Sequence, residues 1–315
     1  MEDLLNPSWN NEERNGMISK ECFLHLQKKV NPASHWYLTE DKIAFHHHCI
    51  KNNLSVPELV AIFDSNGQSY WGNEQGIETK NNLLDGLARY PFDIIMKPVY
   101  GYHGKGVSAL DFVDGVHQFT TDLNLSLCDV FSKILAENPD RYILQKRLYS
   151  HQAIAEFTGN TVLQSLRLIT CLDENSQPKL IIRKIKLPKQ GNLIDNFSWG
   201  TNEGRQCLID EYGKIENFIK YDPIKKHLVR YDYIEDISGK KTEFTIPFWN
   251  QCVVLVLNAQ KAFAPLRTIG WDVAVTNEGP FLIEGNVFWD PLTPQEGSMQ
   301  ATCQLLMELN VPLVN

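Results

Sequence analysis

Two carboxylates near the end of the chain are spaced so that a β-hairpin would bring them together. If residues 277–279 form a three-residue hairpin loop with its glycine in the left-handed conformation, Thr276 faces Pro280. Counting outward along the two strands then places Asp272 directly opposite Glu284, with their Cβ atoms about 5 Å apart. Two carboxylates at that separation on otherwise apolar strands repel each other and are costly to bury.

A divalent cation would remove this repulsion. Asn286 shares the face of Glu284, because side chains along a strand alternate with period two. Asp272, Glu284 and Asn286 offer only oxygen ligands, which suits Mg²⁺ shared with substrate phosphates, with Mn²⁺ as the alternative ion. The competing interpretation is a solvent-exposed face on which both acids are hydrated.

A second stretch, "IMKPVYGYHGKGV" at residues 95–107, has the composition of a phosphate-binding loop but fits neither common pattern. A Walker loop would place Lys and then Ser or Thr after the last glycine, whereas a valine follows Gly106. The dinucleotide fingerprint has glycines at positions one, three and six, whereas Gly101, Gly104 and Gly106 occupy positions one, four and six. Strands on both sides make this a hairpin with a glycine-rich tip, whose backbone N–H groups could approach a triphosphate. Lys97 would add a positive charge beside the phosphates, unless the hairpin is a surface feature and the lysine extends into solvent.

Three consecutive histidines, His46 to His48, suggest a metal site at first sight. Consecutive positions on a helix point about 100° apart, so the three rings cannot converge on one ion. We expect them to be surface or partly packed residues.

Composition limits the class of protein. With 315 residues and 43% hydrophobic content, the chain can bury one large core or form two to three lobes. A net charge of −8 argues against general binding to nucleic acid or to a membrane surface. Seven scattered cysteines without a C-x-x-C pair indicate reduced thiols, and no signal peptide or spanning segment is visible. We expect a cytoplasmic protein without membrane insertion, of undetermined oligomeric state.

Strands and helices are mixed along the chain, and antiparallel hairpins are prominent. This pattern predicts an α+β (mixed α/β) fold with lobes, as opposed to one doubly wound sheet. A helix is predicted within residues 246–266, and the charged, tyrosine-rich segment 211–243 suggests a further β-hairpin. Strands are predicted at 60–63, 92–98, 106–110, 141–148, 161–173, 178–188, 270–276 and 279–286.

Together these motifs resemble the ATP-grasp fold: a lysine before a G-x-x-G-x-G-V hairpin, the strand "YILQKRL" and a terminal D…E-x-N hairpin. The stretches "LQSLRLITCL", "IDNFSWGT", "IPFWNQ" and "IGWDVAVTNEGPFLIEGN" resemble more closely the branch called sugar-transfer-associated ATP-grasp proteins. The resemblance covers about residues 40–310. It implies two α+β lobes that grip ATP between antiparallel sheets. The expected division is a short N-terminal region (1–80) and an ATP-grasp domain (81–315), the latter with a lid lobe (81–144) and a catalytic lobe (145–315).

The resemblance implies roles in ATP binding for individual residues. Lys97 matches the lysine on the α- and β-phosphates, and Lys42 stands where many members have a second nucleotide lysine. The hinge whose backbone receives the adenine corresponds to Gln145, Lys146, Arg147 and Leu148. His151 or Gln152 stands where the family often has an acid that holds the ribose. Asn196 matches an asparagine on the γ-phosphate side.

The same resemblance implies a metal and phosphoryl-transfer site. Its magnesium ligands would be Asp272, Glu284 and Asn286. Arg167, inside an apolar strand, would meet the transferred phosphoryl group or the substrate carboxylate; the alternative is an outward-facing arginine at a sheet edge. On another strand, alternation separates Arg183 from Lys184 and Lys186, and Arg183 is the one we expect to act with Arg167 and Lys97.

Most ATP-grasp enzymes phosphorylate a carboxylate and then let an amine displace the phosphate. The resemblance therefore implies an ADP-forming carboxylate–amine ligase that acts on small molecules through an acyl phosphate. The family name suggests a sugar acid or surface-polysaccharide precursor as the acid, joined to an amino acid or amine. A sugar kinase on the same fold is the alternative, and the sequence does not distinguish the two. An ATP-binding module without turnover is disfavoured by the complete set of Lys97, Asp272, Glu284 and Asn286.

Overall fold

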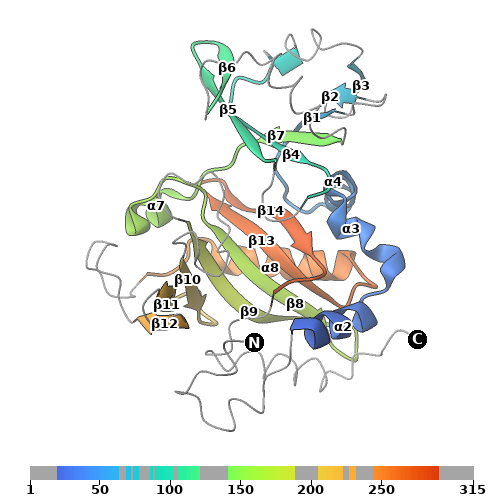
Figure 1. Cartoon of the computed structure of the whole chain (residues 1–315), viewed down its shortest axis with the longest axis vertical. Coiled ribbons are helices and arrows are strands. Elements are labelled where there is room, and N and C mark those ends of the chain that lie inside the picture. The colour runs from blue at the N-terminus through green and yellow to red at the C-terminus, as the bar shows by residue number, and fades with distance from the viewer. Residues whose placement is uncertain are drawn as a thin grey trace. The chain divides into compact units, whose positions relative to one another are not determined.

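The computed structural model describes residues 20–63, 69–71, 74–77, 86–87, 89–101, 106–120, 141–188, 205–222, 227–231 and 244–290. The chain divides into two compact units (Figure 1). The smaller unit consists of Glu40–Lys51 and Val56–Leu148, and the larger unit consists of Met1–Thr39, Asn52–Ser55 and Tyr149–Asn315. Each unit contains a seven-stranded antiparallel sheet with helices, which confirms the predicted α+β class. In the described part of the chain, no helix is both long and apolar enough to cross a membrane.

The sheet of the smaller unit has the strand order β3-β2-β1-β7-β4-β5-β6. Its strands are β1 (Leu59–Phe63), β2 (Ser69–Trp71), β3 (Glu74–Ile77), β4 (Ile94–Pro98), β5 (Ser108–Val113), β6 (Val116–Phe119) and β7 (Tyr142–Lys146). Strands β4 and β5 pair antiparallel, with Ile94 opposite Leu110 and Met96 opposite Ser108, so the predicted hairpin around the glycines is confirmed. Strand β7 lies at the centre between β1 and β4. The strand that carries the predicted hinge is therefore paired along both of its edges.

Alternation along β4 separates the core of the smaller unit from its candidate site. Ile94, Met96 and Pro98 are buried, whereas Ile95 and Lys97 are only partly buried. Met96 packs in one core cluster with residues of β1, β5 and β7. Helix α4 (Lys42–Lys51) packs separately, through Ile43, against Val99 and strands β1 and β7. Lys97 therefore points away from the cluster that contains Met96.

The sheet of the larger unit has the order β12-β11-β10-β9-β8-β13-β14. Its strands are β8 (Ser165–Leu172), β9 (Pro178–Leu187), β10 (Arg205–Ile209), β11 (Ile215–Asp222), β12 (His227–Tyr231), β13 (Thr268–Thr276) and β14 (Gly279–Asn286). Its helices are α2 (Lys20–Val30), the single turn η2 (Ala33–His35), α3 (Tyr37–Glu40, which ends in the smaller unit), α7 (Gln152–Thr158) and α8 (Trp249–Ala262). Strands β11 and β12 form the hairpin expected within residues 211–243.

Helix α8 covers one face of this sheet, against β8, β9, β13 and β14 (Figure 1). Beneath it lies a buried polar chain: the indole of Trp271 donates to Thr170 Oγ1 at 2.8 Å, and that hydroxyl donates to Gln260 Oε1 at 2.6 Å. The Trp271 ring also packs edge-on against Phe263. Because Trp271 faces α8, its neighbour Asp272 must face the other side of the sheet.

The N-terminal segment fixes the start of β13. The buried side chain of Asn31, which directly follows α2, accepts hydrogen bonds from the amides of Arg267 and Thr268 and donates to the carbonyl of Thr268. Phe23 of α2 packs edge-on against Trp289, with ring centroids 4.9 Å apart. Residues upstream of 40 thus belong to the packing of the strand that carries Asp272.

Candidate functional site

Asp272 and Glu284 are opposite each other, as the hairpin count predicted. The details of that count are wrong, because Thr276 pairs with Gly279 and not with Pro280. With the loop one residue shorter than expected, a regular ladder would not place Asp272 opposite Glu284. A register shift next to Asp272 restores this pair. Gly279 has the expected positive φ, 118°. A β-bulge therefore places the two carboxylates together.

Two cations hold Asp272. Arg167 donates from Nε to Oδ1 at 2.7 Å and from Nη2 to Oδ2 at 3.1 Å. Lys186 Nζ lies 2.9 Å from Oδ2. The strand register explains Arg167: β13 pairs with β8 so that Asp272 is directly opposite it, and Glu284 is opposite Asp272 on the other side. Arginine, aspartate and glutamate thus form a row across three neighbouring strands.

The ionisation state of Asp272 follows from these neighbours. Burial by itself raises its pKa, but the positive charges of Arg167 and Lys186, together with hydrogen bonds to Lys186 and Glu284, outweigh burial, and the pKa lies below its ordinary value. Asp272 is 5% exposed and carries its negative charge at neutral pH. A metal ligand must be deprotonated, and this one already is.

The donor set fits a hard divalent cation. Glu284 and Asn286 lie next to each other, with Asn286 Nδ2 3.3 Å from Glu284 Oε1, and Glu284 faces Asp272. Two carboxylates and one amide provide oxygen ligands alone, and few enough that Mg²⁺ could keep water and phosphate oxygens as its remaining ligands. Each carboxylate oxygen has two lone pairs, so Asp272 could bind a metal and still accept from Arg167.

A glycine gives Arg167 room. A Cβ built on Gly270 would lie 2.7 Å from the Cβ of Trp289 and 3.4 Å from Nη1 of Arg167. Trp289 is itself fixed, because its indole donates to Thr268 Oγ1 at 3.1 Å and its carbonyl accepts from Gln27. The absence of a side chain at residue 270 therefore lets the tryptophan and the guanidinium approach the strand together.

The structure does not bring Arg183 to the acids. Arg183 pairs with Leu168, on the face opposite Arg167, and its Nε donates to the carbonyl of Ile209 at 3.3 Å. Lys186 is the basic residue of β9 that reaches Asp272, and sequence reasoning missed it. The signal was the predicted alternation, which separated Arg183 from the two lysines; the register of β9 against β8 was needed to choose between the faces.

In the smaller unit, Lys97 and Lys42 both have defined places. Lys97 Nζ donates to Gln145 Oε1 at 3.2 Å. Lys42 Nζ donates to the carbonyls of Val99 and Gly101, at 3.5 and 3.2 Å. Lys97 thus lies just before the segment that leads into the glycine loop, and Lys42 contacts the carbonyls of that segment. Gly104 lies outside the described residues.

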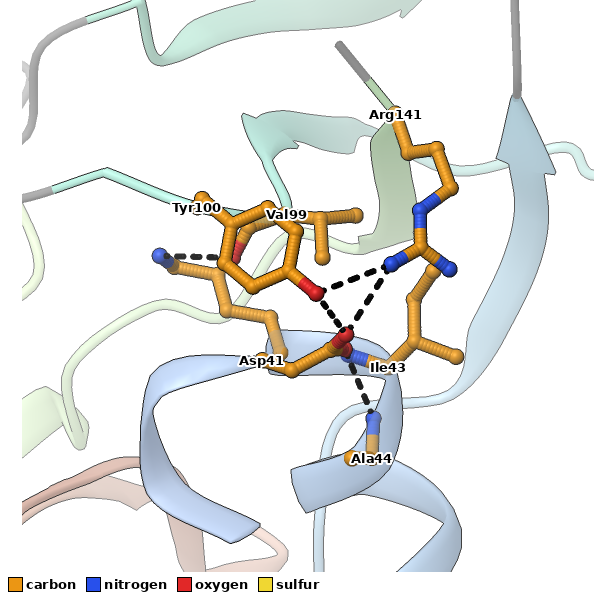
Figure 2. Close-up of polar contacts among 7 residues, drawn as sticks. Asp41, Ile43, Ala44, Val99, Tyr100 and Arg141 are labelled. Atoms are coloured by element: carbon orange, nitrogen blue, oxygen red, sulfur yellow. Dashed lines mark hydrogen bonds and ion pairs between the residues drawn. The ribbon is translucent and has the colours of Figure 1, made fainter. Parts of the chain in front are cut away.

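A carboxylate anchors this segment (Figure 2). Asp41 caps α4 by accepting from two backbone amides of the first turn through Oδ1. Its Oδ2 accepts from the Tyr100 hydroxyl at 2.6 Å and from Arg141 Nη2 at 3.1 Å. The hydrogen bond to Asp41 raises the pKa of Tyr100, so the phenol stays protonated. Tyr100 directly precedes Gly101, and the cluster therefore ties the start of the loop to the helix that carries Lys42.

At the other end of the loop, Gly106 has a φ of +74°, and a Cβ there would lie 2.8 Å from Pro98 Cγ. Both observations favour glycine at this position.

The predicted hinge is held by its backbone and side chains. The amides of Lys146 and Arg147 donate to the carbonyls of Glu58 and Asp93, at 2.9 and 2.8 Å. Arg147 also forms an ion pair with Asp111 at 2.7 Å, and the ammonium of Lys146 lies 5.6 Å from the ring centre of Phe92. Gln145 is buried and Leu148 follows at the end of the unit. Of the hinge amides, those of residues 146 and 147 are therefore already used by the protein.

His151 belongs to the larger unit, where it caps α7. Its Nδ1 accepts from the amide of Ala153 at 3.0 Å, and its ring packs edge-on against Phe248. The amide of the neighbouring Gln152 donates to Asn277 Oδ1. One ring nitrogen of His151 is thus used for capping, which leaves Nε2 for any ligand contact. Asn196 lies outside the described residues.

Comparisons with known proteins place these findings in context. The family model described as sugar-transfer associated ATP-grasp matches residues 23–302, and so begins upstream of residue 40. No curated protein matches the chain. Among solved structures, the chain is similar to an ADP complex of N5-carboxyaminoimidazole ribonucleotide synthetase, with a TM-score of 0.50 and 13% identity over 95% of this chain and 60% of that one.

Two further similar structures are ligases whose names include their amino-acid substrates. The D-Ala:D-Ser ligase VanG from Enterococcus faecalis gives a TM-score of 0.47 and 12% identity over 86% of this chain and 61% of its own. The D-alanine–D-alanine ligase from Bacillus anthracis gives 0.43 and 12% over 88% of this chain and 67% of its own. The chain thus spans about 60% of the first-named structures, and at such identities the likeness concerns the fold alone.

Proposed function

Because the chain belongs to the sugar-transfer-associated ATP-grasp family, we propose that it is an ATP-dependent, ADP-forming carboxylate–amine ligase. The observation that carries this proposal is the charged row on β8, β13 and β14. There a deprotonated Asp272 lies between Arg167 and Glu284, with Lys186 beside it. Such a row combines oxygen ligands for a cation with basic groups for anionic oxygens, and phosphoryl transfer to a carboxylate requires both.

In the first step, a carboxylate oxygen of the acid substrate attacks the γ-phosphorus of ATP. The bond from that phosphorus to the β–γ bridging oxygen breaks, ADP leaves and an acyl phosphate forms. Mg²⁺ held by Asp272, Glu284 and Asn286 would neutralise phosphate oxygens during this transfer. Arg167 is the residue we assign to the transferred group, because a guanidinium has five N–H donors and spends two of them on Asp272. Lys186 adds a second positive charge beside it.

In the second step, the amine nitrogen attacks the carbonyl carbon of the acyl phosphate. The carbon–oxygen bond to the phosphate breaks, inorganic phosphate leaves and an amide forms. The amine enters as the free base, and the proton that it loses after attack passes to the departing phosphate. Water must be kept away at this stage, because it would hydrolyse the acyl phosphate.

The smaller unit supplies the groups that we assign to the phosphates and the adenine of the nucleotide. Lys97 and Lys42 would contact its phosphates, together with backbone N–H groups of the loop that runs from Gly101 to Gly106. The amides of Lys146 and Arg147 are used internally, so we assign the adenine contact to the amide of Leu148. The ribose would fall to His151 through Nε2, since its Nδ1 caps α7.

We propose small-molecule substrates: a sugar acid or a surface-polysaccharide precursor as the carboxylate, and an amino acid or another amine as the nucleophile. The association of the family with sugar transfer supports the sugar-linked acid. We assign no part of the reaction to Arg183, which faces away from the acids.

The proposal is tested by measuring ADP release from Mg-ATP in the presence of hydroxylamine. The acids to be tested are uronic acids, sugar-nucleotide uronates and amino acids. Hydroxamate formed together with ADP is the expected result and names the acid. ADP formed with a stable phosphorylated sugar and no hydroxamate would replace the ligase with a kinase. The Glu284→Gln variant, which should be inactive, controls for contaminating ATPases.

A further inference from the structure

A chain of three side chains connects helix α4 to the nucleotide lysine. Lys97 Nζ donates to Gln145 Oε1 at 3.2 Å, and Gln145 Nε2 lies 3.3 Å from His46 Nδ1. Gln145 and His46 are each 5% exposed. The interpretation of His46 as one of three surface or partly packed histidines is therefore incomplete, because its ring is buried and has a defined polar partner.

We propose that His46 is a positioning residue, which acts through Gln145 to fix the ammonium of Lys97 for the nucleotide phosphates. The inference rests on the proposed function, since it assumes that Lys97 binds a nucleotide. It adds a residue 99 positions away from Gln145 along the chain to the groups that determine nucleotide affinity.

The contacts fix the orientation of the Gln145 amide. A lysine ammonium only donates, so the Gln145 atom facing Lys97 must be the carbonyl oxygen. The amide nitrogen then faces His46 and needs an acceptor there. Nδ1 accepts only when it carries no proton, which requires the neutral ring with its proton on Nε2. A histidine protonated on Nδ1 would instead favour a turned amide, whose NH₂ group would face the ammonium.

The surroundings keep His46 in the form that this chain requires. Burial, followed by the nearby charges of His47 and Lys97, lowers the pKa of His46 to about 4. The ring is therefore neutral throughout the physiological range. His47 is exposed on the same helix, with its ring centre 6.0 Å from that of His46.

A fixed acceptor is useful to a lysine because its four-carbon stem has many rotamers. Ordering such a side chain when the ligand arrives lowers affinity, whereas a lysine already held in place loses less freedom on binding. The strands supply the geometry: Gln145 on β7 pairs with Ile95, and Lys97 on β4 pairs with Ile143, so Gln145 and Lys97 are diagonal neighbours on one face.

The test compares two substitutions of His46 by calorimetric titration with Mg-ADP. His46→Leu fills the site but cannot accept, and we expect it to weaken ADP binding at least fivefold. His46→Asn places a carbonyl oxygen near the position of Nδ1, and we expect its affinity to stay within twofold of the wild type. His47→Ala is the matched control from the same helix and should bind ADP unchanged. Melting temperatures show whether each variant folds.

The decisive comparison repeats His46→Leu in a Lys97→Ala background. If His46 acts through Lys97, the second substitution causes no further loss of affinity. A further fivefold loss would show that the histidine supports the fold in general and would overturn the inference, as would wild-type affinity in His46→Leu alone. A wild-type protein that binds no ADP would overturn the proposed function, and this inference with it.

Discussion

The two units hold their key charged side chains by different means. In the smaller unit, Lys97 donates to a neutral amide, which is itself oriented by a neutral histidine. In the larger unit, Asp272 is held by two cations, Arg167 and Lys186, at 2.7 and 2.9 Å. One arrangement orients a charge through dipoles, and the other embeds a charge among opposite charges.

The difference has a consequence for mutation. Removing any one member of a buried ion cluster strongly destabilises the protein, because the remaining charges are still buried, where water hydrates them poorly. The neutral amide of Gln145, by contrast, loses only a hydrogen bond when Lys97 is removed. Substitution of Asp272, Arg167 or Lys186 should therefore lower both activity and stability, whereas substitutions around Lys97 should lower nucleotide affinity alone.

The largest effect is expected for Asp272→Asn. It removes a proposed metal ligand and takes the Asp272 carboxylate away from Arg167 and Lys186. Turnover of ATP should fall by about a thousandfold or more, because metal stabilisation contributes several kcal/mol to the transition state. Unfolding in urea should show a loss of about 3 kcal/mol.

Glu284→Gln is the matched variant on the opposite strand. It should abolish Mg-dependent turnover while leaving the melting temperature nearly unchanged, since Arg167 and Lys186 keep Asp272. Turnover at the wild-type rate in Glu284→Gln would refute the metal assignment, and an unaltered stability of Asp272→Asn would refute the contrast between the units.

Gly270→Ala tests the geometry of the ion cluster without changing any charge. The new methyl group would lie 2.7 Å from the Cβ of Trp289 and 3.4 Å from the Arg167 guanidinium. Overpacking of this kind should reduce stability by about 1–3 kcal/mol. Denaturant unfolding measures it; Gly270 has no positive φ, so a loss of stability reports the crowding and not backbone strain. A Gly270→Ala variant as stable as the wild type would mean that Trp289 moves freely.

Lys97→Ala addresses the smaller unit. Affinity for ATP should fall at least tenfold, which corresponds to about 1.4 kcal/mol. The melting temperature should change little, because Gln145 loses a hydrogen bond and no charged partner is left buried by that bond. Calorimetric titration and thermal unfolding of the same samples make the comparison. A large loss of stability would mean that the two units do not differ in the proposed way.

The smallest effect is expected for Tyr100→Phe. The substitution removes the hydroxyl that donates to Asp41 at 2.6 Å but leaves the Arg141 bond to the same oxygen. Because Tyr100 is half exposed, stability should fall by less than about 1 kcal/mol. The KM for ATP should rise about two- to threefold as the start of the glycine loop loosens. A change in kcat without a change in KM would argue against an anchoring role.

Features that depend only on neighbouring residues could be predicted from the sequence. The hairpin around the glycines and the alternation on β9 follow from turn chemistry and from the period of a strand, and the structure contains both. The pairing of Asp272 with Glu284 was predicted from a wrong loop count, which the bulge beside Asp272 corrected. Sequence spacing alone does not reveal a bulge, because it depends on how the strand packs.

Contacts between residues far apart along the chain could not be predicted from the sequence. Identifying Lys186, and not Arg183, as the residue beside Asp272 required the register between β8 and β9. That register depends on the packing of the whole sheet and not on these two strands alone. The contact between His46 and Gln145 joins a helix to a central strand, and nothing in the run of three histidines distinguishes His46 from its neighbours. The domain boundaries remain a prediction. In the sheet of the smaller unit β1 pairs with β7, so this sheet contains residues from both sides of the proposed boundaries at residues 80 and 144.

The central claim is that a carboxylate oxygen becomes bonded to the γ-phosphorus of ATP and later leaves with the phosphate. We would therefore supply the acid identified by the hydroxamate assay with ¹⁸O in its carboxylate, together with Mg-ATP and the amine, and analyse the inorganic phosphate by mass spectrometry. The account predicts one ¹⁸O atom in each phosphate released by turnover. Unlabelled phosphate, formed at the same rate as the product, would contradict an acyl phosphate and with it the ligase mechanism.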